Sequence, residues 1–272
     1  MSGLSPTLHR KAWALIALGF GLFLTLTGTA AILWHHVLWL TMMPHPHSLI
    51  PVLGVTLVAT GMAVVAWGRA VKAGYRLITS HRQWSHRIRS RLMPFPTPPV
   101  WPSARWHFYA GDDFSGFTWG VIRPHIAVSR SFWDRLTESE RLAVMWHEAH
   151  HARYRVPLEK VLLALLDALY PGWGYGQVLR RLVVTEEILA DRWAIEALGD
   201  DTPLISALLK WLPSDGHALD TSVGWEDALS ARIRFLEHPT LLEEPPSIVS
   251  PVLATTALEV AMLAQGIIFW CH

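Results

Sequence analysis

The stretch HEAHH, from His147 to His151, combines the residue types of a zinc hydrolase site. His147 and His151 lie four residues apart, so on a helix both imidazoles share one face and can reach one ion. Neutral imidazole is a good zinc ligand. Glu148 is rotated by about 100° around the axis. It can therefore reach a water held by the metal, take its proton and deliver that proton to a leaving amine.

A catalytic zinc needs a third protein ligand and one open position. Glu187 and Asp191 lie on the next strongly helical stretch, again four residues apart and on one face. We expect Glu187 to complete the shell of one Zn²⁺ per chain. Asp191 would accept a hydrogen bond from a ligand histidine and fix its tautomer. Glu186 faces elsewhere, and His150 points off the ligand row, where it would pack or support the site.

Local signals predict helices around both halves of this site. Thr137 followed by Glu140 is a capping-box pattern and predicts a helix that begins near Glu138. The helix that carries Glu187 should end at Gly199, a natural C-terminal cap. The apolar run 161–170 is too short to span a membrane and indicates a core helix or one lying against the membrane.

Two short strands, 117–119 and 125–128, precede the zinc helix and are separated by turn residues, which favours a hairpin. A polypeptide substrate could lie extended beside 116–121, with backbone hydrogen bonds fixing its register.

The composition points to a membrane protein. Only 17% of the residues are charged, against about a quarter in soluble proteins, and the mean hydropathy is +0.26. Three apolar stretches, at about 12–34, 49–71 and 248–270, are long enough to span a bilayer. A net charge of +1 argues against nucleic-acid binding. The single cysteine, Cys271, excludes an internal disulfide and a multi-cysteine zinc site.

Lys and Arg in the short flanks predict the orientation. They precede the first span, are missing from the link 41–48, and recur after the second span. The N-terminus and the catalytic domain should therefore be cytoplasmic and the C-terminus outside, in a multi-pass protein of the cell membrane. The expected fold is mainly α, with three spans and a cytoplasmic zincin-type α+β metallopeptidase domain. Its expected regions are a two-span membrane region (1–71), a basic and proline-rich linker (72–102) that is stiff over 93–102, the zinc domain (103–247) and a final span (248–272).

The order of two spans, basic linker, short strands, HEAHH, an apolar helix ending in Pro-Gly and then EILAD resembles membrane-embedded gluzincin peptidases. It is most similar to BlaR/MecR-type antirepressor peptidases and more distantly to HtpX-like proteases. The resemblance covers about 106–236. It implies zinc ligands at His147, His151 and Glu187, a catalytic base at Glu148, and a cytoplasmic active site near the membrane. Receptor-type members carry a penicillin-binding domain after the last span, whereas this sequence ends at His272, so a self-contained β-lactam receptor is not expected.

The sequence offers fewer signals for the function of several other polar residues. Arg232, in a helical stretch at 228–236, could stabilise the oxyanion of the transition state, although a surface position is the more common one for arginine. His217 and His238 are further candidates for that role. Glu259 and Gln265 within the third span could act in function or pair inside the bundle. Four histidines, at 35, 36, 45 and 47, surround the outer loop.

The function expected from the sequence is a zinc-dependent endopeptidase that cleaves a polypeptide, such as a cytoplasmic repressor or a membrane protein, in regulatory signalling. Two alternatives remain open. One is a membrane quality-control protease, and the other is a scaffold that retains zinc for folding. Glu148 discriminates against the scaffold, because a purely structural site has no use for a water-activating carboxylate.

Overall fold

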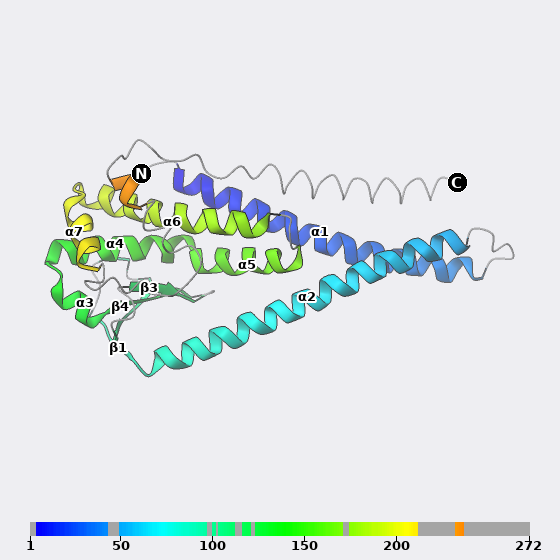
Figure 1. The fold of residues 1–272 in the computed structure, drawn as a ribbon, viewed down its shortest axis with the longest axis horizontal. Helices are drawn as coiled ribbons and strands as arrows, with labels where there is room; N and C mark the ends of the chain where they lie inside the picture. Colours follow the sequence, from blue (N-terminus) through cyan, green and yellow to red (C-terminus); the bar gives the residue numbers. More distant parts are fainter. Residues whose placement is uncertain are drawn as a thin grey trace. The chain divides into compact units, whose positions relative to one another are not determined.

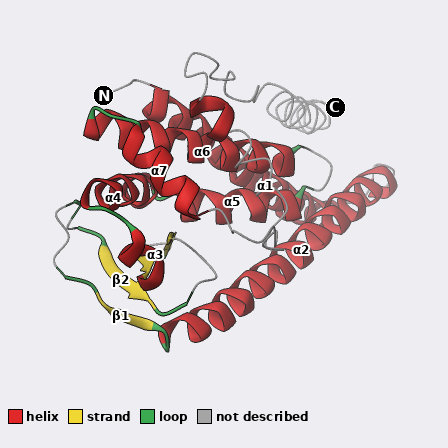
Figure 2. Cartoon of the chain, turned by 60° about the vertical axis from the view of Figure 1, so that its left-hand side comes forward, coloured by secondary structure: helices red, strands yellow, loops and turns green. Residues whose placement is uncertain are grey.

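A computed structural model describes residues 4–42, 49–96, 100–101, 103–111, 116–120, 123–170, 174–211 and 232–236. The chain is mainly helical with one small sheet (Figures 1 and 2), as expected from the sequence. The elements in order are α1 (Leu4–Leu40), α2 (Leu49–Arg89), β1 (Leu92–Pro94), β2 (Arg105–Tyr109), β3 (Gly116–Trp119), β4 (His125–Ser129), α3 (Arg130–Arg135), α4 (Glu138–Tyr154), α5 (Val156–Leu169), α6 (Tyr175–Leu198) and α7 (Thr202–Trp211). Residues 232–236 are also helical.

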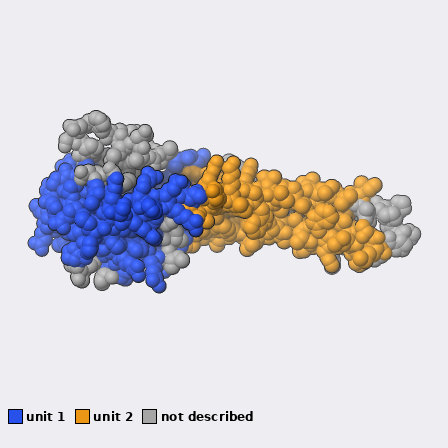
Figure 3. Space-filling model, turned by 90° about the horizontal axis from the view of Figure 1, so that it is seen from below, with its two compact units in different colours: residues 1–9, 79–161, 177–246 blue, residues 10–78, 162–176, 247–272 orange. Residues whose placement is uncertain are grey.

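Two compact units interleave along the chain (Figure 3). Unit 1 comprises residues 1–9, 79–161 and 177–246, and unit 2 comprises 10–78, 162–176 and 247–272. Within the stretch expected to be a linker, 72–102, α2 continues as far as Arg89 and β1 follows it. The first proline of that stretch is Pro94, so nothing before it removes a helical backbone donor.

The sheet of unit 1 has the strand order β1-β2-β4-β3. β3 and β4 are the expected antiparallel pair, with Thr118 opposite Ile126. The sequence did not indicate β1 and β2, and β2 runs parallel to β4, so the sheet is mixed rather than the small antiparallel element expected. β4 lies in the interior, with Ile126, Ala127 and Val128 fully buried. β3 lies at one edge of the sheet and contacts α4.

α4 begins as the sequence predicts. The backbone N–H of Glu140 donates to the Thr137 hydroxyl, and the Thr137 N–H donates to the Glu140 carboxylate, which completes a capping box. The helix packs its apolar side into the main core of unit 1, together with β2, β4, α3 and α7. The buried members of that core are Val100, Ala104, Trp106, Ile126, Val128, Phe132, Leu136, Met145, Ala149, Ala152 and Ala207.

The end of α4 and the end of α6 are both set by residues with positive φ. Arg155, at φ 54°, closes α4 and separates it from α5. Gly199, at φ 72°, follows α6, and its N–H donates to the Ile195 carbonyl, which is the glycine cap expected there. α5 covers most of the run 161–170 and buries Leu163 and Leu166, which confirms the expected core helix.

Unit 2 contains most of α1 and α2, which are the two helices of the described residues that are long and apolar enough to cross a membrane. Small residues let these two helices approach closely, since Ala30, Ala59 and Ala63 form one buried cluster. Trp34 also donates from Nε1 to the Thr60 hydroxyl at 2.7 Å. The expected third span, with Glu259, Gln265 and Cys271, lies outside the described residues, as do His45, His47, His217 and His238.

Candidate metal centre

α4 and α6 bring His147, His151 and Glu187 together within unit 1. These three residues form a group whose ligand atoms all lie within 4.8 Å of one another. His147 Nε2 lies 3.3 Å from His151 Nε2 and 3.4 Å from Glu187 Oε2. His151 Nε2 lies 3.6 Å from Glu187 Oε1. The helical spacing in α4 aligns the two imidazoles, and the side-by-side packing of α4 and α6 supplies the carboxylate.

These distances test whether the residues fit zinc. With zinc–ligand bonds of about 2.0–2.2 Å, two ligand atoms of a tetrahedron lie about 3.3–3.6 Å apart. The three separations fall in that range. Two imidazole nitrogens that face each other at 3.3 Å cannot both carry a lone pair without a proton or a cation nearby. The donor set and its spacing therefore fit a zinc ion.

Asp191 contacts His147 on the side of its ring away from Glu187, and Arg232 binds Asp191. His147 Nδ1 lies 2.8 Å from Asp191 Oδ1, so Nδ1 carries the hydrogen and Nε2 is left to face Glu187. Arg232 donates from Nε to Asp191 Oδ2 and from Nη2 to Oδ1, both at 2.7 Å. Its Nη1 lies 3.5 Å from Glu187 Oε2. Arg232 is buried, which corrects the surface position weighed from the sequence, and the side chain is engaged with these two carboxylates.

The electrostatics differ between the two histidines. Burial disfavours a charged His147, but its hydrogen bonds with Asp191 and Glu187 raise its pKa to about 9. Burial lowers the pKa of His151 to about 3. Burial also works against an ionised Glu187, yet His151 and His147 hold its pKa well below the usual range. A metal that binds here displaces the proton of His147, so binding releases a proton.

Glu148 lies beside the group, against β3. The Thr118 hydroxyl donates to Glu148 Oε2 at 2.8 Å. Gly116 lies on the same face of β3, and a Cβ at that position would be 2.9 Å from Glu148 Oε1. Burial raises the pKa of Glu148, against the opposing influence of His147 and of the Thr118 bond. A raised pKa makes this carboxylate a stronger base.

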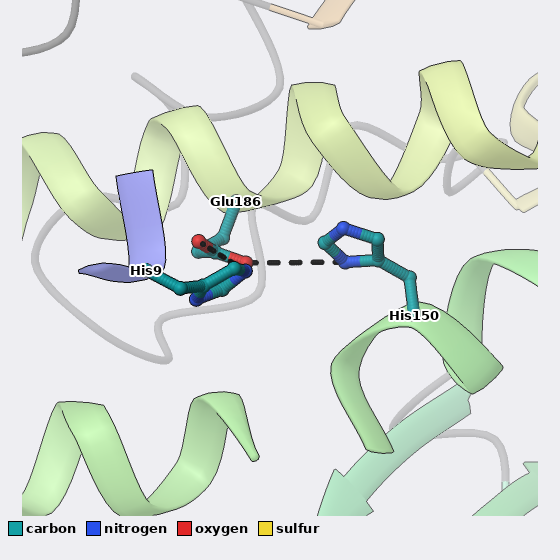
Figure 4. A group of neighbouring side chains, drawn as sticks. All are labelled: His9, His150 and Glu186. Atoms are coloured by element: carbon teal, nitrogen blue, oxygen red, sulfur yellow. Dashed lines mark ion pairs between the residues drawn. The ribbon is translucent and has the colours of Figure 1, made fainter. Parts of the chain in front are cut away.

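His150 and Glu186 do not join this group. They lie with His9, from the beginning of α1, in a second group of possible metal ligands (Figure 4). The sequence indicated only that His150 and Glu186 face away from the zinc ligands, and it gave no reason to single out His9. The doublets His150-His151 and Glu186-Glu187 are the one signal that could have suggested a second polar cluster.

Comparison with known proteins finds no family model that matches the chain, no similar curated protein and no similar solved structure.

Proposed function

We propose that the protein is a membrane-bound zinc endopeptidase of the gluzincin type. One observation carries the proposal: two imidazole nitrogens and the two oxygens of the Glu187 carboxylate lie at separations that match the edge of a zinc tetrahedron, and a buried carboxylate outside this set, Glu148, lies beside His147. A structural site has no need of that carboxylate, whereas a hydrolase does. Zinc held by His147, His151 and Glu187 would supply a Lewis acid that polarises a water molecule and the scissile carbonyl.

Glu148 moves the proton in this proposal. Its carboxylate accepts a proton from the attacking water and returns it to the nitrogen of the leaving amine. The Thr118 hydroxyl holds Oε2, which leaves Oε1 as the atom that exchanges the proton. Burial raises the pKa of Glu148, which strengthens the carboxylate as a proton acceptor.

Asp191 and Arg232 hold the ligands in place. Asp191 fixes the ring of His147 through Nδ1, and its own pKa stays low because Arg232 and His147 outweigh the effect of burial. Arg232 binds Asp191 with two hydrogen bonds, so both oxygens of this buried carboxylate are satisfied. We assign Arg232 to positioning, because its donors already face Asp191 and Glu187.

The edge position of β3 supports an extended polypeptide as the substrate. No strand in the described part of the chain pairs with β3 on the side away from β4. A peptide added there would form backbone hydrogen bonds along the strand that carries Thr118 and Gly116, the two neighbours of Glu148. Its scissile carbonyl would then lie near the proposed base. The substrate class proposed is a polypeptide cleaved in regulatory signalling.

The exposed apolar side chains of α1 and α2 support a membrane location. In water such side chains would be unfavourable, but hydrocarbon satisfies them. They include Leu24, Ile32 and Leu38 on α1, and Leu57, Val58, Val64, Val65 and Val71 on α2. Lys72, Arg76, Arg82, Arg87 and Arg89 follow the apolar part of α2, which favours a cytoplasmic side for that end.

Glu148→Gln in the full chain, reconstituted in lipid nanodiscs with zinc, tests the proposal. Cleavage of fluorescein-labelled casein as an unstructured probe should fall by at least about 10³-fold, because the base is lost, while zinc at the first group is retained. Glu138→Gln is the matched control, since Glu138 lies exposed in the first turn of the same helix. Full casein cleavage by Glu148→Gln would reject the mechanism. Zinc binding by the wild type without any cleavage would favour the scaffold.

A further inference from the structure

The second polar group of unit 1 is built from the same two helices as the first. His150 and Glu186 each precede one of the proposed zinc ligands, so they point to an adjacent face of α4 and of α6. His9, from the beginning of α1, completes the group (Figure 4). Glu186 and His150 are fully buried, and His9 is 5% exposed. These side chains are therefore shielded from solvent that could solvate their polar atoms.

The orientation of His9 is fixed by Glu159 of α5. His9 Nδ1 lies 3.1 Å from Glu159 Oε1 and 3.0 Å from Oε2. An ionised carboxylate only accepts hydrogen bonds, so Nδ1 donates and a neutral His9 carries its lone pair on Nε2. That lone pair faces Glu186 Oε1 at 3.5 Å. Two acceptors that face each other in a buried site require a proton or a metal cation between them.

Glu186 presents the same requirement. Neither of its carboxylate oxygens has a hydrogen-bond partner among the described residues, and neither is exposed to solvent. An ionised carboxylate in that state is strongly disfavoured unless a cation compensates it. His150 Nδ1 lies 3.9 Å from Glu186 Oε2, so a second imidazole nitrogen approaches the same carboxylate.

We propose that His9, His150 and Glu186 form a second site for a divalent transition-metal ion of the zinc class, distinct from the proposed catalytic ion. One ligand atom from each of the three residues lies within 4.8 Å of the other two. The 3.5 Å separation matches the edge of a zinc tetrahedron, about 3.3–3.6 Å. The 3.9 Å separation requires a small rotation of the Glu186 carboxylate. Two imidazoles and a carboxylate suit zinc better than the hard cations.

The surroundings assign this ion a structural role. The His9 ring stacks on Tyr154 at 4.2 Å between centroids, and Trp193 lies edge-on to His150 at 5.0 Å. These aromatic rings contact the group, and the further carboxylate that the described residues place beside it, Glu159, is bound to His9 Nδ1. An ion bound by these ligands would fasten the first turns of α1 to α4 and α6, the helices that carry the proposed catalytic ligands.

Metal stoichiometry tests this inference without any activity measurement. The purified full chain in nanodiscs, saturated with Zn²⁺ and then desalted, should contain two zinc equivalents by elemental mass spectrometry. His9→Asn and Glu186→Gln should each contain one. Asn retains a donor near the position of Nδ1 for Glu159 but lacks Nε2, so this variant removes a ligand with little disturbance of the fold.

Two further variants separate the possible outcomes. His35→Ala removes an exposed histidine of the same helix and should keep both equivalents, which would exclude His35 as a ligand of the second ion. Glu187→Ala should keep the second equivalent alone. If the wild type bound one zinc equivalent and His9→Asn retained it, the inference would be overturned. A proton would then link His9 and Glu186. Two equivalents that survive His9→Asn would overturn it as well. A third result is also possible, in which the wild type binds one zinc equivalent, Glu187→Ala retains it and His9→Asn loses it. That result would support the second site and contradict the proposed function.

Discussion

The two histidine–glutamate groups of unit 1 share a plan but differ in what surrounds them. Each takes one residue from the His150-His151 doublet and one from the Glu186-Glu187 doublet. Each also has a histidine whose Nδ1 faces a buried carboxylate, Asp191 for His147 and Glu159 for His9. Adjacent residues on a helix point about 100° apart, so one helix pair can serve two groups on neighbouring faces.

The difference lies beyond the ligand atoms. The first group has Glu148 beside it, held by Thr118 at the edge strand β3, where a polypeptide can approach. The second contacts the rings of Tyr154 and Trp193. A neighbouring base and access to substrate can therefore give different roles to ligand sets of the same composition. We expect a catalytic metal ion at the first group and a structural metal ion at the second.

The largest effect is expected from Glu187→Ala. This variant removes the only carboxylate of the first group, and the two remaining imidazoles cannot hold the ion at comparable strength. Zinc affinity of the first equivalent should fall by about 10³-fold or more and casein cleavage should cease, as measured by competition with a chromogenic chelator and by the cleavage assay. The exposed Glu196→Gln on the same helix is the control. Zinc affinity within tenfold of wild type would mean that another residue is the third ligand.

A smaller effect is expected where an orienting carboxylate is changed. Asp191→Asn weakens the hydrogen bond that fixes His147 and removes one of the two carboxylates that pair with Arg232. Affinity of the first zinc equivalent should fall by about 10–100-fold, with the second unchanged. Glu159→Gln is the mirror variant and should weaken only the second equivalent, through His9. If either variant weakened both equivalents alike, the two groups would have to be treated as one coupled site.

The residues that could be predicted from the sequence are those whose relation is local. Three of these features each depend on a single helix: the spacing of His147 and His151, the capping box at Thr137 and the glycine cap at Gly199. The described structure contains the capping box and the glycine cap as expected. Glu187 and Asp191 could be selected because they share a helical face.

The remaining features depend on contacts between distant segments. His9 meets Glu159 across a sequence separation of 150 residues, and Arg232 meets Asp191 across 41, so no periodic pattern could reveal either pair. Strands β1 and β2 are short. β2 pairs with β4 in parallel, so no hairpin turn in the sequence indicates the pairing. The extension of α2 to Arg89 was missed because the basic residues were taken as part of a linker.

A third prediction concerns the helix that the two groups share. Burial opposes an ionised Glu140, but Lys210 at 2.6 Å, Ser206 and Thr137 outweigh it and lower its pKa to about 2. The folded-state pKa therefore lies below the unfolded value of 4.5. The stabilisation is present above about pH 4.5 and is lost as the pH falls towards 2.

Glu140→Gln should destabilise the chain by about 1–3 kcal/mol at pH 7, because the ion pair with Lys210 and part of the capping box are lost. The difference from wild type, measured by thermal unfolding in detergent, should shrink as the pH is lowered below about 4.5. Glu138→Gln is again the control, since Glu138 is exposed. Both zinc equivalents should weaken together, because α4 supplies ligands to both groups. A pH-independent difference would show that the charge of Glu140 is not what stabilises α4.

The smallest effect expected is also the one most specific to the first group. Gly116→Ala places a Cβ 2.9 Å from Glu148 Oε1 and 3.5 Å from the Ala127 carbonyl. The end of the Glu148 side chain can yield by a few tenths of an ångström, so the fold should survive, but the proposed base leaves its position and strains its bond to Thr118. Because proton transfer depends steeply on geometry, kcat for casein should fall by about tenfold. KM and both zinc equivalents should stay unchanged.

Gly54→Ala, with nothing within 4 Å of the added carbon, is the control for a glycine-to-alanine change in itself. A fall in the second zinc equivalent would show that β3 supports both groups, whereas an unchanged kcat would remove Glu148 Oε1 from the proton path and with it the main distinction between the two groups.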